Sequence, residues 1–288
     1  MTKVTNKKSQ FSEIWRKFKR NKLAVVGLVL LVCVLLMAVF ADVIADYDLQ
    51  VIFQNRRSRR VAPCAEFWFG TDALGRDIFA RVVHGSRITL SIAFSTTILS
   101  ALAGGTLGAL TGYYGGRLDN IVMRLVDIIM SIPSMLFSIA IVAALGPSTI
   151  NLLLAMTIGQ MPRFTRVVRS LMISAAADDY VEAAKVCGAS NMRIVVHHIF
   201  PNIIGPVIVQ MTMTIASIIL TTAGLGFIGL GVQPPAPEWG TMLSEARDYM
   251  LTDPHMVLIP GLAIALAVFA FNTIGDGLRD ALDPRMND

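Results

Sequence analysis

Five apolar runs without charged residues constrain this sequence more than any other feature. They cover residues 23–41, 88–110, 128–161, 203–233 and 256–274. About 20 helical residues cross the ~30 Å hydrocarbon core of a bilayer, so each run is long enough to span a membrane. The third run is long enough for two helices and contains Gly146-Pro147, a strong turn signal. The pattern therefore predicts an all-α membrane protein with six transmembrane helices.

Composition and charge agree with a membrane protein. Hydrophobic residues make up 54% of the 288 residues, charged residues 16%, and the mean hydropathy is +0.62. The net charge of +5 raises the alternative of nucleic-acid binding, but many basic residues flank the apolar runs. Eight of them lie within residues 3–22, against the single acid Glu13. This asymmetry predicts a cytoplasmic N-terminus and disfavours nucleic acid as a partner.

The first apolar run also resembles a secretory signal peptide, because basic residues precede it. However, the run exceeds the ~7–15 residues of a signal h-region, and no small-x-small cleavage site follows it. We therefore expect it to remain as a membrane anchor.

Six helices that start in the cytoplasm place residues 111–120, 162–202 and the C-terminal tail inside, and residues 46–87 and 234–255 outside. Segment 162–202 is rich in basic residues and segment 234–255 in acidic ones, as the positive-inside rule requires. The outer cluster Arg56, Arg57, Arg59 and Arg60 departs from the rule. It is expected either to face solvent and lipid headgroups or to contact an acidic partner protein.

These assignments divide the chain into five parts. They are an N-terminal cytoplasmic segment (1–22), a first transmembrane helix (23–45), an extracytoplasmic loop (46–87), a core of five helices (88–278) that includes the cytoplasmic loop 162–202, and a cytoplasmic tail (279–288).

Catalytic, metal and nucleotide sites are not indicated. The three cysteines and four histidines show no metal-binding spacing, and Cys33 and Cys187 are expected to pack as small apolar side chains. Residues 224–229 match G-x-G-x-x-G, but they lie in an apolar run without a βαβ unit. Because the chain has no G-x-x-x-x-G-K-[ST] motif, any ATP is expected to bind another polypeptide.

Two features within the runs predict helix contacts. Gly104, Gly108 and Gly112 share one helical face, which favours close packing against another helix. Arg124 and Asp127 are three residues apart, so they are expected to pair on one face; a proton relay is the alternative.

The loop 162–202 is predicted to form a helical hairpin. Asp179 and Glu182 form a D-x-x-E pattern that is typical of a helix N-terminus. Gly188 is a predicted left-handed stop, and Asn191 is predicted to cap a second helix that ends before Pro201. Ala183 and Ala184 have small side chains, so this face of the helix is suited to docking closely into a groove of another protein.

Residues 180–190 (YVEAAKVCGAS), with Ile194, His198, Ile199, Pro201 and Asn202, closely resemble the EAA loop of permeases in binding-protein-dependent ABC importers. Residues 69–77, 227–240 and 271–284 resemble the C-type permease subunit of the dipeptide and oligopeptide branch. Departures are Cys187, Gly226, Ile228 and the arginine cluster at 56–60. Related branches import nickel, glutathione and other small solutes, so these substrates stay open.

The resemblance implies a type I ABC importer permease fold in a bacterial inner membrane, carrying di- or oligopeptides. It implies a coupling helix around residues 177–188 that docks on a cytoplasmic ATPase. The implied coupling residues are Asp179, Tyr180, Glu182, Ala183, Ala184, Gly188, Ala189, Ile194 and Pro201.

The implied partners are a homologous B-type permease, two ABC ATPase subunits and an extracytoplasmic substrate-binding protein. The ATPases would use ATP and Mg, while this chain would bind no cofactor and perform no catalysis. An ion-coupled secondary transporter or an intramembrane enzyme is less favoured, because the apolar runs contain few ionisable groups.

Overall fold

The structure, a computed structural model, describes residues 10–282. Residues 1–9 and 283–288, which belong to the predicted N-terminal segment and C-terminal tail, lie outside this range. Within it the chain is mainly helical, the longest loop covers residues 59–77, and no β-strand occurs. The elements are α1 (Gln10–Arg20), α2 (Lys22–Val39), α3 (Ala41–Ile44), the π turn η1 (Tyr47–Ile52), the 3-10 turn η2 (Arg56–Ser58), α4 (Ile78–Tyr114), α5 (Gly116–Met130), α6 (Ser134–Leu145), α7 (Thr149–Ala176), α8 (Asp179–Val186), α9 (Asn191–Arg193), the π turn η3 (Ile194–Ile199), α10 (Phe200–Phe227), α11 (Trp239–Ala246), the 3-10 turn η4 (Arg247–Tyr249) and α12 (His255–Leu282).

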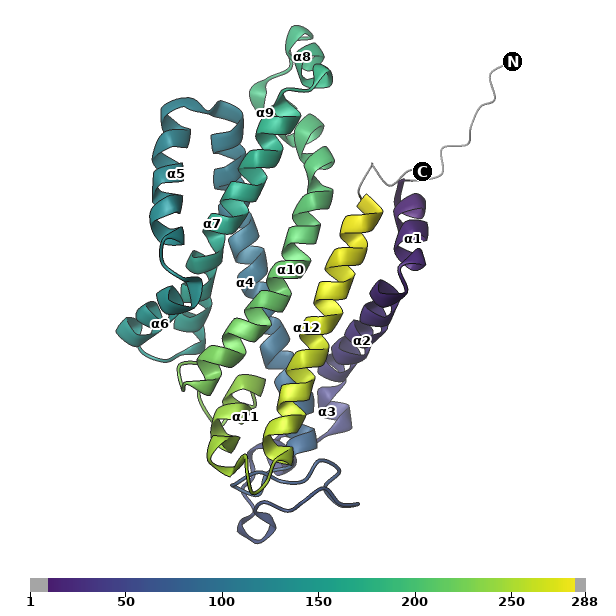
Figure 1. The fold of residues 1–288 in the computed structure, drawn as a ribbon, viewed down its shortest axis with the longest axis vertical. Coiled ribbons are helices and arrows are strands. Elements are labelled where there is room, and N and C mark those ends of the chain that lie inside the picture. Colours follow the sequence, from purple (N-terminus) through teal and green to yellow (C-terminus); the bar gives the residue numbers. More distant parts are fainter. Residues whose placement is uncertain (1–9, 283–288) are drawn as a thin grey trace, which may run out of the picture.

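The long helices form a bundle in which α4 packs along α7, α10 along α12, and α12 against α2 (Figure 1). Helices α1 and α8 and the last turn of α12 lie at one end, which we call the hairpin end. Helix α11 and the loop that precedes α4 lie at the opposite end, which we call the α11 end. The segments predicted to be inside thus share one end, and those predicted to be outside share the other.

Among residues 10–282, four helices are long and apolar enough to cross a membrane: α2, α4, the continuous helix Asn191–Phe227 and α12. Helices α5 and α6 add a fifth if they count as one span bent by 84°. Helix α7 does not meet the criterion, because Arg163, Arg166 and Arg169 interrupt its second half. The predicted all-helical membrane fold is therefore confirmed, whereas the count of six spans stays a prediction.

The third apolar run is broken twice rather than once. The predicted turn at Gly146-Pro147 separates α6 from α7, and Gly146 has a φ of +90°. A second break separates α5 from α6, where Pro133 is the N-cap residue of α6. Proline disfavours the α conformation of the residue before it, here Ile132, which explains why the helix is interrupted here.

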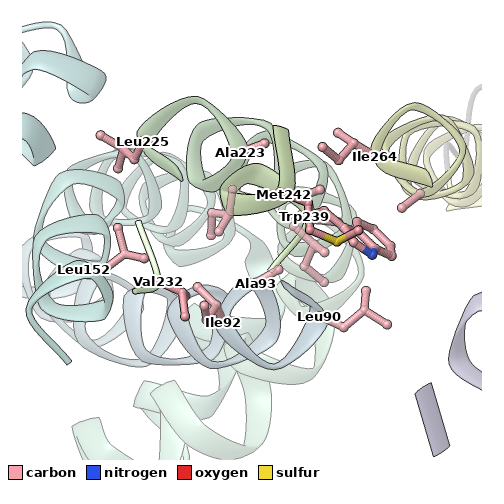
Figure 2. Close-up of a cluster of buried hydrophobic side chains, with 14 of the residues drawn as sticks. Leu90, Ile92, Ala93, Leu152, Ala223, Leu225, Val232, Trp239, Met242 and Ile264 are labelled. Atoms are coloured by element: carbon pink, nitrogen blue, oxygen red, sulfur yellow. The ribbon is translucent and has the colours of Figure 1, made fainter. Parts of the chain in front are cut away.

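A buried apolar core joins helices α2, α4, α6, α7, α10, α11 and α12, and part of it is drawn in Figure 2. Leu90 and Ala93 of α4 face Ala223 of α10 and Ile264 of α12. Trp239 of α11 is fully buried between them. The Nε1 atom of Trp239 donates to the Val82 carbonyl at 3.0 Å, so its polar atom is satisfied inside the core.

The glycine face of α4 lies against the backbone of α7. A Cβ atom on Gly108 would lie 2.5 Å from the Thr165 carbonyl oxygen, and one on Gly112 would lie 2.7 Å from the Arg169 carbonyl oxygen. Gly104 faces the Met161 carbonyl in the same way. Since no larger residue fits these positions without displacing backbone, the glycines set the distance between α4 and α7.

The predicted pair of Arg124 and Asp127 does not form. Asp127 accepts instead from Nη2 of Arg166 on α7, at 2.7 Å, and Arg124 is exposed. Asp119 of α5 accepts from Nε and Nη2 of Arg169 at 2.5 and 2.6 Å. The prediction considered neighbours on one helix, whereas these aspartates contact arginines of the adjacent helix α7.

Candidate functional site

The predicted hairpin is present and protrudes from the hairpin end of the bundle (Figure 1). Its first helix, α8, begins at Asp179, one residue earlier than a cap at Asp179 would place it. The N-cap residue is Asp178, whose side chain makes no capping hydrogen bond, so the assignment of Asp179 as the cap was wrong. Val181 is fully buried, whereas Tyr180, Glu182 and Ala183 are exposed.

Gly188 ends this helix as predicted, with a φ of +79°. The Ala189 amide donates to the Ala184 carbonyl, and the Gly188 amide donates to the Lys185 carbonyl, each at 3.0 Å. This pair of bonds is the Schellman motif, which requires a left-handed residue at the position of Gly188. Nothing lies within 4 Å of a Cβ placed on Gly188, so backbone conformation rather than space favours glycine here.

The second helix begins at Asn191, whose Oδ1 atom accepts from the Tyr113 hydroxyl of α4 at 3.0 Å. It does not end before Pro201. The chain passes through the π turn η3 into α10, and the Phe200 amide bonds to the Val195 carbonyl, five residues back. Pro201 closely follows this π turn, whose wider hydrogen-bond pairing accommodates a residue without an amide hydrogen inside the continuous helix.

A separate apolar cluster fixes the hairpin to the bundle. Val181, Ile194 and Ile199 are fully buried, and they pack with Met172 of α7 and Ile203 of α10. The outer side of the hairpin is different, because Val186 is 84% exposed and Met192 72%. Apolar side chains exposed on a firmly anchored projection are typical of a contact surface for another protein. No sequence pattern indicated these two residues.

The predicted site residues therefore divide by location. Asp179, Tyr180, Glu182, Ala183 and Gly188 are exposed on the hairpin, and Ala184 and Ala189 are half-buried at its turn. Ile194 is buried beneath it, and Pro201 lies exposed at the start of α10.

The α11 end contains a buried ionic cluster that sequence analysis also missed. Arg76 and Arg81 are 2% and 1% exposed, and both donate to Asp72 Oδ2 at 2.6 Å. Both also donate to Glu245 Oε2 of α11 at 2.7 Å. Two arginines share two carboxylates, so the four charges balance in a site where all but Glu245, which is 22% exposed, are almost fully buried. The cluster fastens the loop before α4 to both α4 and α11.

A second buried carboxylate lies at the start of α11. Glu238 is the N-cap residue of this helix, and its Oε2 atom accepts from the Thr241 amide at 2.9 Å. The Thr89 hydroxyl of α4 donates to its Oε1 atom at 3.3 Å. Burial raises the pKa of Glu238, and the hydrogen bonds from the α11 backbone oppose this only in part.

The arginine cluster 56–60 is exposed, since Arg56, Arg57, Arg59 and Arg60 all reach the surface. Arg60 also donates to Asp253 Oδ2 at 3.4 Å and lies 5.3 Å from the ring centre of Tyr249.

Cysteines and metal-ligating groups offer no further site in the part of the chain that the structure describes. No group of three His, Cys, Asp or Glu side chains is arranged to hold a metal ion within residues 10–282. Cys33 and Cys187 are exposed free thiols, so the expectation that they pack as small apolar side chains was wrong.

Comparison with known proteins agrees with this architecture. Residues 104–288 match the family model of the binding-protein-dependent transport system inner membrane component. Residues 9–63 match the N-terminal TM domain of oligopeptide transport permease C. The permease of the MetNI methionine ABC transporter, in an inward-facing conformation, superposes with a TM-score of 0.58 at 18% identity, over 72% of this chain and 98% of that chain. This likeness concerns the fold.

Curated relatives match along almost the whole chain. The dipeptide transport system permease DppC of Alkalihalophilus pseudofirmus is 46% identical, over 96% of this chain and 91% of its own. The di/tripeptide permease DppC of Pseudomonas aeruginosa is 43% identical, over 96% and 93%. The glutathione permease GsiD of Escherichia coli is 40% identical, over 99% and 94%. The chain is thus a membrane-embedded permease component, and it belongs to the family of binding-protein-dependent transport system inner membrane components.

Proposed function

We propose that this chain is the C-type permease subunit of an ATP-driven importer of di- and oligopeptides. The observation that carries the coupling role is the exposed hairpin, which is anchored on two long helices and bears the residues that resemble an EAA loop. The peptide substrate is supported by two relatives named as dipeptide and di/tripeptide permeases.

In this mechanism, α8 lies in a cleft of a cytoplasmic ATPase subunit. Glu182 supplies a charge to the contact, while Ala183 and Ala184 allow a close approach. Because Val181, Ile194 and Ile199 link the hairpin to α7 and α10, a displacement of α8 moves both helices together. Closure of the ATPase dimer on ATP would thus shift the bundle from an inward-facing to an outward-facing state.

The complete importer would contain a homologous B-type permease, two ATPases that use ATP and Mg, and a substrate-binding protein on the outer side. The chain would lie in the bacterial inner membrane with both termini in the cytoplasm. This chain would transmit force and perform no chemistry, so the purified chain alone is expected to show no ATP hydrolysis.

The first test measures uptake of a labelled dipeptide in cells that lack this gene, complemented with wild type, Gly188→Pro or Glu182→Lys. Proline cannot adopt the φ of +79° or donate the amide bond at residue 188, and lysine reverses a charge on the docking face. Both variants are expected to insert normally, as judged by their amount in the membrane, but to lose most uptake.

Ser190→Ala is the matched control, because this exposed side chain at the same turn makes no capping hydrogen bond. It should transport like wild type. Normal uptake by both Gly188→Pro and Glu182→Lys would contradict the coupling role.

Glutathione is the second candidate substrate, because a glutathione permease is 40% identical over nearly the full chain. Parallel uptake of labelled glutathione and of nickel separates the substrates. If wild type restores uptake of glutathione but not of the dipeptide, the peptide assignment is wrong and the importer assignment stands.

A further inference from the structure

The break between α5 and α6 forms one side of a pocket against α7. The two helices meet at a bend of 84° across residues 131–133, and both pack on α7 (Figure 1). Pro133 and Ser134 line the pocket from the break, and Gln160 and Arg163 line it from α7. Non-helical backbone within a membrane span is tolerated where it is buried in protein or lines a polar cavity, and this pocket meets that requirement.

The N-terminus of α6 adjoins the pocket without a side-chain cap. The helix is 12 residues long, and its N-cap residue, Pro133, accepts no hydrogen bond through its side chain. The first amides of a helix have no acceptor within the helix, and they give its N-terminus a partial positive charge. Because Ser134, the first residue of α6, lines the pocket, this end of the helix favours an anionic group there.

Gln160 provides an independent indication of a ligand. Its side chain is only 6% exposed and lines the pocket. The side-chain amide nevertheless makes no hydrogen bond to any residue of the range 10–282. Buried amides are nearly always hydrogen-bonded, and an unpaired one costs free energy. A polar ligand in the pocket would supply the missing partner.

Arg163 gives the pocket its charge. It lies three residues after Gln160, so the two side chains share one face of α7. Arg166 and Arg169 of the same helix pair with aspartates of α5, whereas Arg163 forms no ion pair within residues 10–282. No acidic residue lines the pocket, so the positive charge is not neutralised there. The forked donors of a guanidinium match the two oxygens of a carboxylate.

We propose that this pocket binds a carboxylate, and that the carboxylate is the C-terminus of the peptide in transit. Arg163 donates to its two oxygens, the Gln160 amide donates to one of them, and the N-terminus of α6 stabilises the charge. Every linear peptide with a free C-terminus carries this group whatever its side chains, so one site serves many sequences. The source of the carboxylate rests on the proposed function, whereas the preference of the pocket for an anion does not.

A thiol placed in the pocket tests the proposal directly. Ile132→Cys is introduced into the full importer after Cys33, Cys64 and Cys187 are replaced by serine. Ile132 lines the pocket, is 43% exposed and has no polar group to bind the ligand. The rate of maleimide labelling is measured on the purified complex without ATP and without the substrate-binding protein, so that only the membrane part recognises a peptide.

We expect dialanine to slow this labelling and alanyl-alaninamide, which lacks the carboxylate, to leave it unchanged. Adding Arg163→Gln should raise the dialanine concentration needed for the same effect by roughly tenfold, because a charge-assisted hydrogen bond is lost. Arg163→Lys, which keeps the charge, should retain part of the protection. Gln160→Leu should also weaken it.

Ile121→Cys in the same background is the matched control, because Ile121 is 63% exposed on α5 but does not line the pocket. Neither peptide should change its labelling. Equal effects of dialanine and its amide at position 132, or protection that survives Arg163→Gln unchanged, would overturn the proposal. If Arg163 pairs instead with an acidic side chain of another subunit, neither peptide slows labelling and the proposal fails.

Uptake of a labelled dipeptide by cells that carry wild type is recorded in parallel. Normal uptake without protection at position 132 would refute the carboxylate site and leave the transport role intact. Protection by dialanine without dipeptide uptake would refute the proposed transport role, while the pocket would remain a carboxylate site.

Discussion

At the scale of single residues, charged side chains far apart in sequence meet at the α11 end. Arg81 and Glu245 are 164 residues apart, yet they share one buried cluster with Asp72 and Arg76. Burying one such charge without its partners is far more costly than burying the balanced set. Exposed ion pairs such as Arg247 with Asp248, at 3.5 Å, contribute much less to the stability of the fold.

Arg81→Gln is therefore expected to destabilise the protein by about 3–5 kcal/mol, because Asp72 and Glu245 would keep only Arg76 as a shared cation. Arg247→Gln, which removes one partner of an exposed pair, should change stability by less than about 1 kcal/mol. Thermal unfolding of the purified chain measures both. Equal shifts would show that the buried cluster does not stabilise the fold.

The buried carboxyl group of Glu238 predicts that the stability of the folded protein depends on pH. Burial raises its pKa above the ordinary value of 4.5, so the folded protein keeps a proton that the unfolded chain releases. The stability that this proton confers is complete below pH 4.5 and is lost as pH rises through the raised pKa.

Glu238→Gln is expected to become more stable relative to wild type as pH rises from 4.5 toward neutrality, since the amide never ionises. Exposed Glu66→Gln serves as the control and should follow wild type at each pH. Unfolding curves across this range measure the difference; a constant difference between Glu238→Gln and wild type would rule out the linkage.

At the scale of helices, close approach depends on which glycines face a neighbour. Gly108 contacts the α7 backbone, whereas the nearest atom to a Cβ on Gly105, three residues earlier, is Val168 Cγ2 at 3.8 Å. The sequence shows both glycines in one helix, but only the packed structure shows that α7 is the partner.

Gly108→Ala is expected to destabilise the protein by about 1–3 kcal/mol, because the methyl group forces α4 and α7 apart. Gly105→Ala should be neutral or stabilising by up to about 1 kcal/mol, because alanine favours the helix and the space is free. Thermal unfolding of the two variants distinguishes them. A larger loss for Gly105→Ala would contradict the packing at the glycine face.

At the scale of the whole molecule, the proposed orientation places the α11 end outside the membrane and the hairpin end inside. Native cysteines at the two ends can be used to test this orientation. Cys64 lies in the loop at the α11 end, Cys187 lies on the hairpin, and both are exposed. With the other cysteines replaced by serine, a membrane-impermeant maleimide added to intact spheroplasts should label Cys64 and leave Cys187 unmodified. In permeabilised cells, the maleimide should label both Cys64 and Cys187. Labelling of Cys187 alone in intact cells would reverse the proposed orientation.

The sequence by itself determined the features that depend on local composition and conformation. Apolar run length predicted a helical membrane protein, and Gly188 predicted the turn of the hairpin because only glycine adopts its left-handed conformation without strain. Family resemblance located the site but not its exposed apolar residues.

The tertiary structure alone decided which distant groups meet. Asp127 contacts Arg166 rather than its helical neighbour Arg124, and Arg81 meets Glu245. The helix continues through Pro201 because the π turn before it accommodates the missing amide hydrogen. Helices α2 and α12 diverge and leave a crevice between them. The physical reason is the same in each case. Partner choice and cavity shape depend on the relative positions of several helices, and no local sequence pattern encodes these positions.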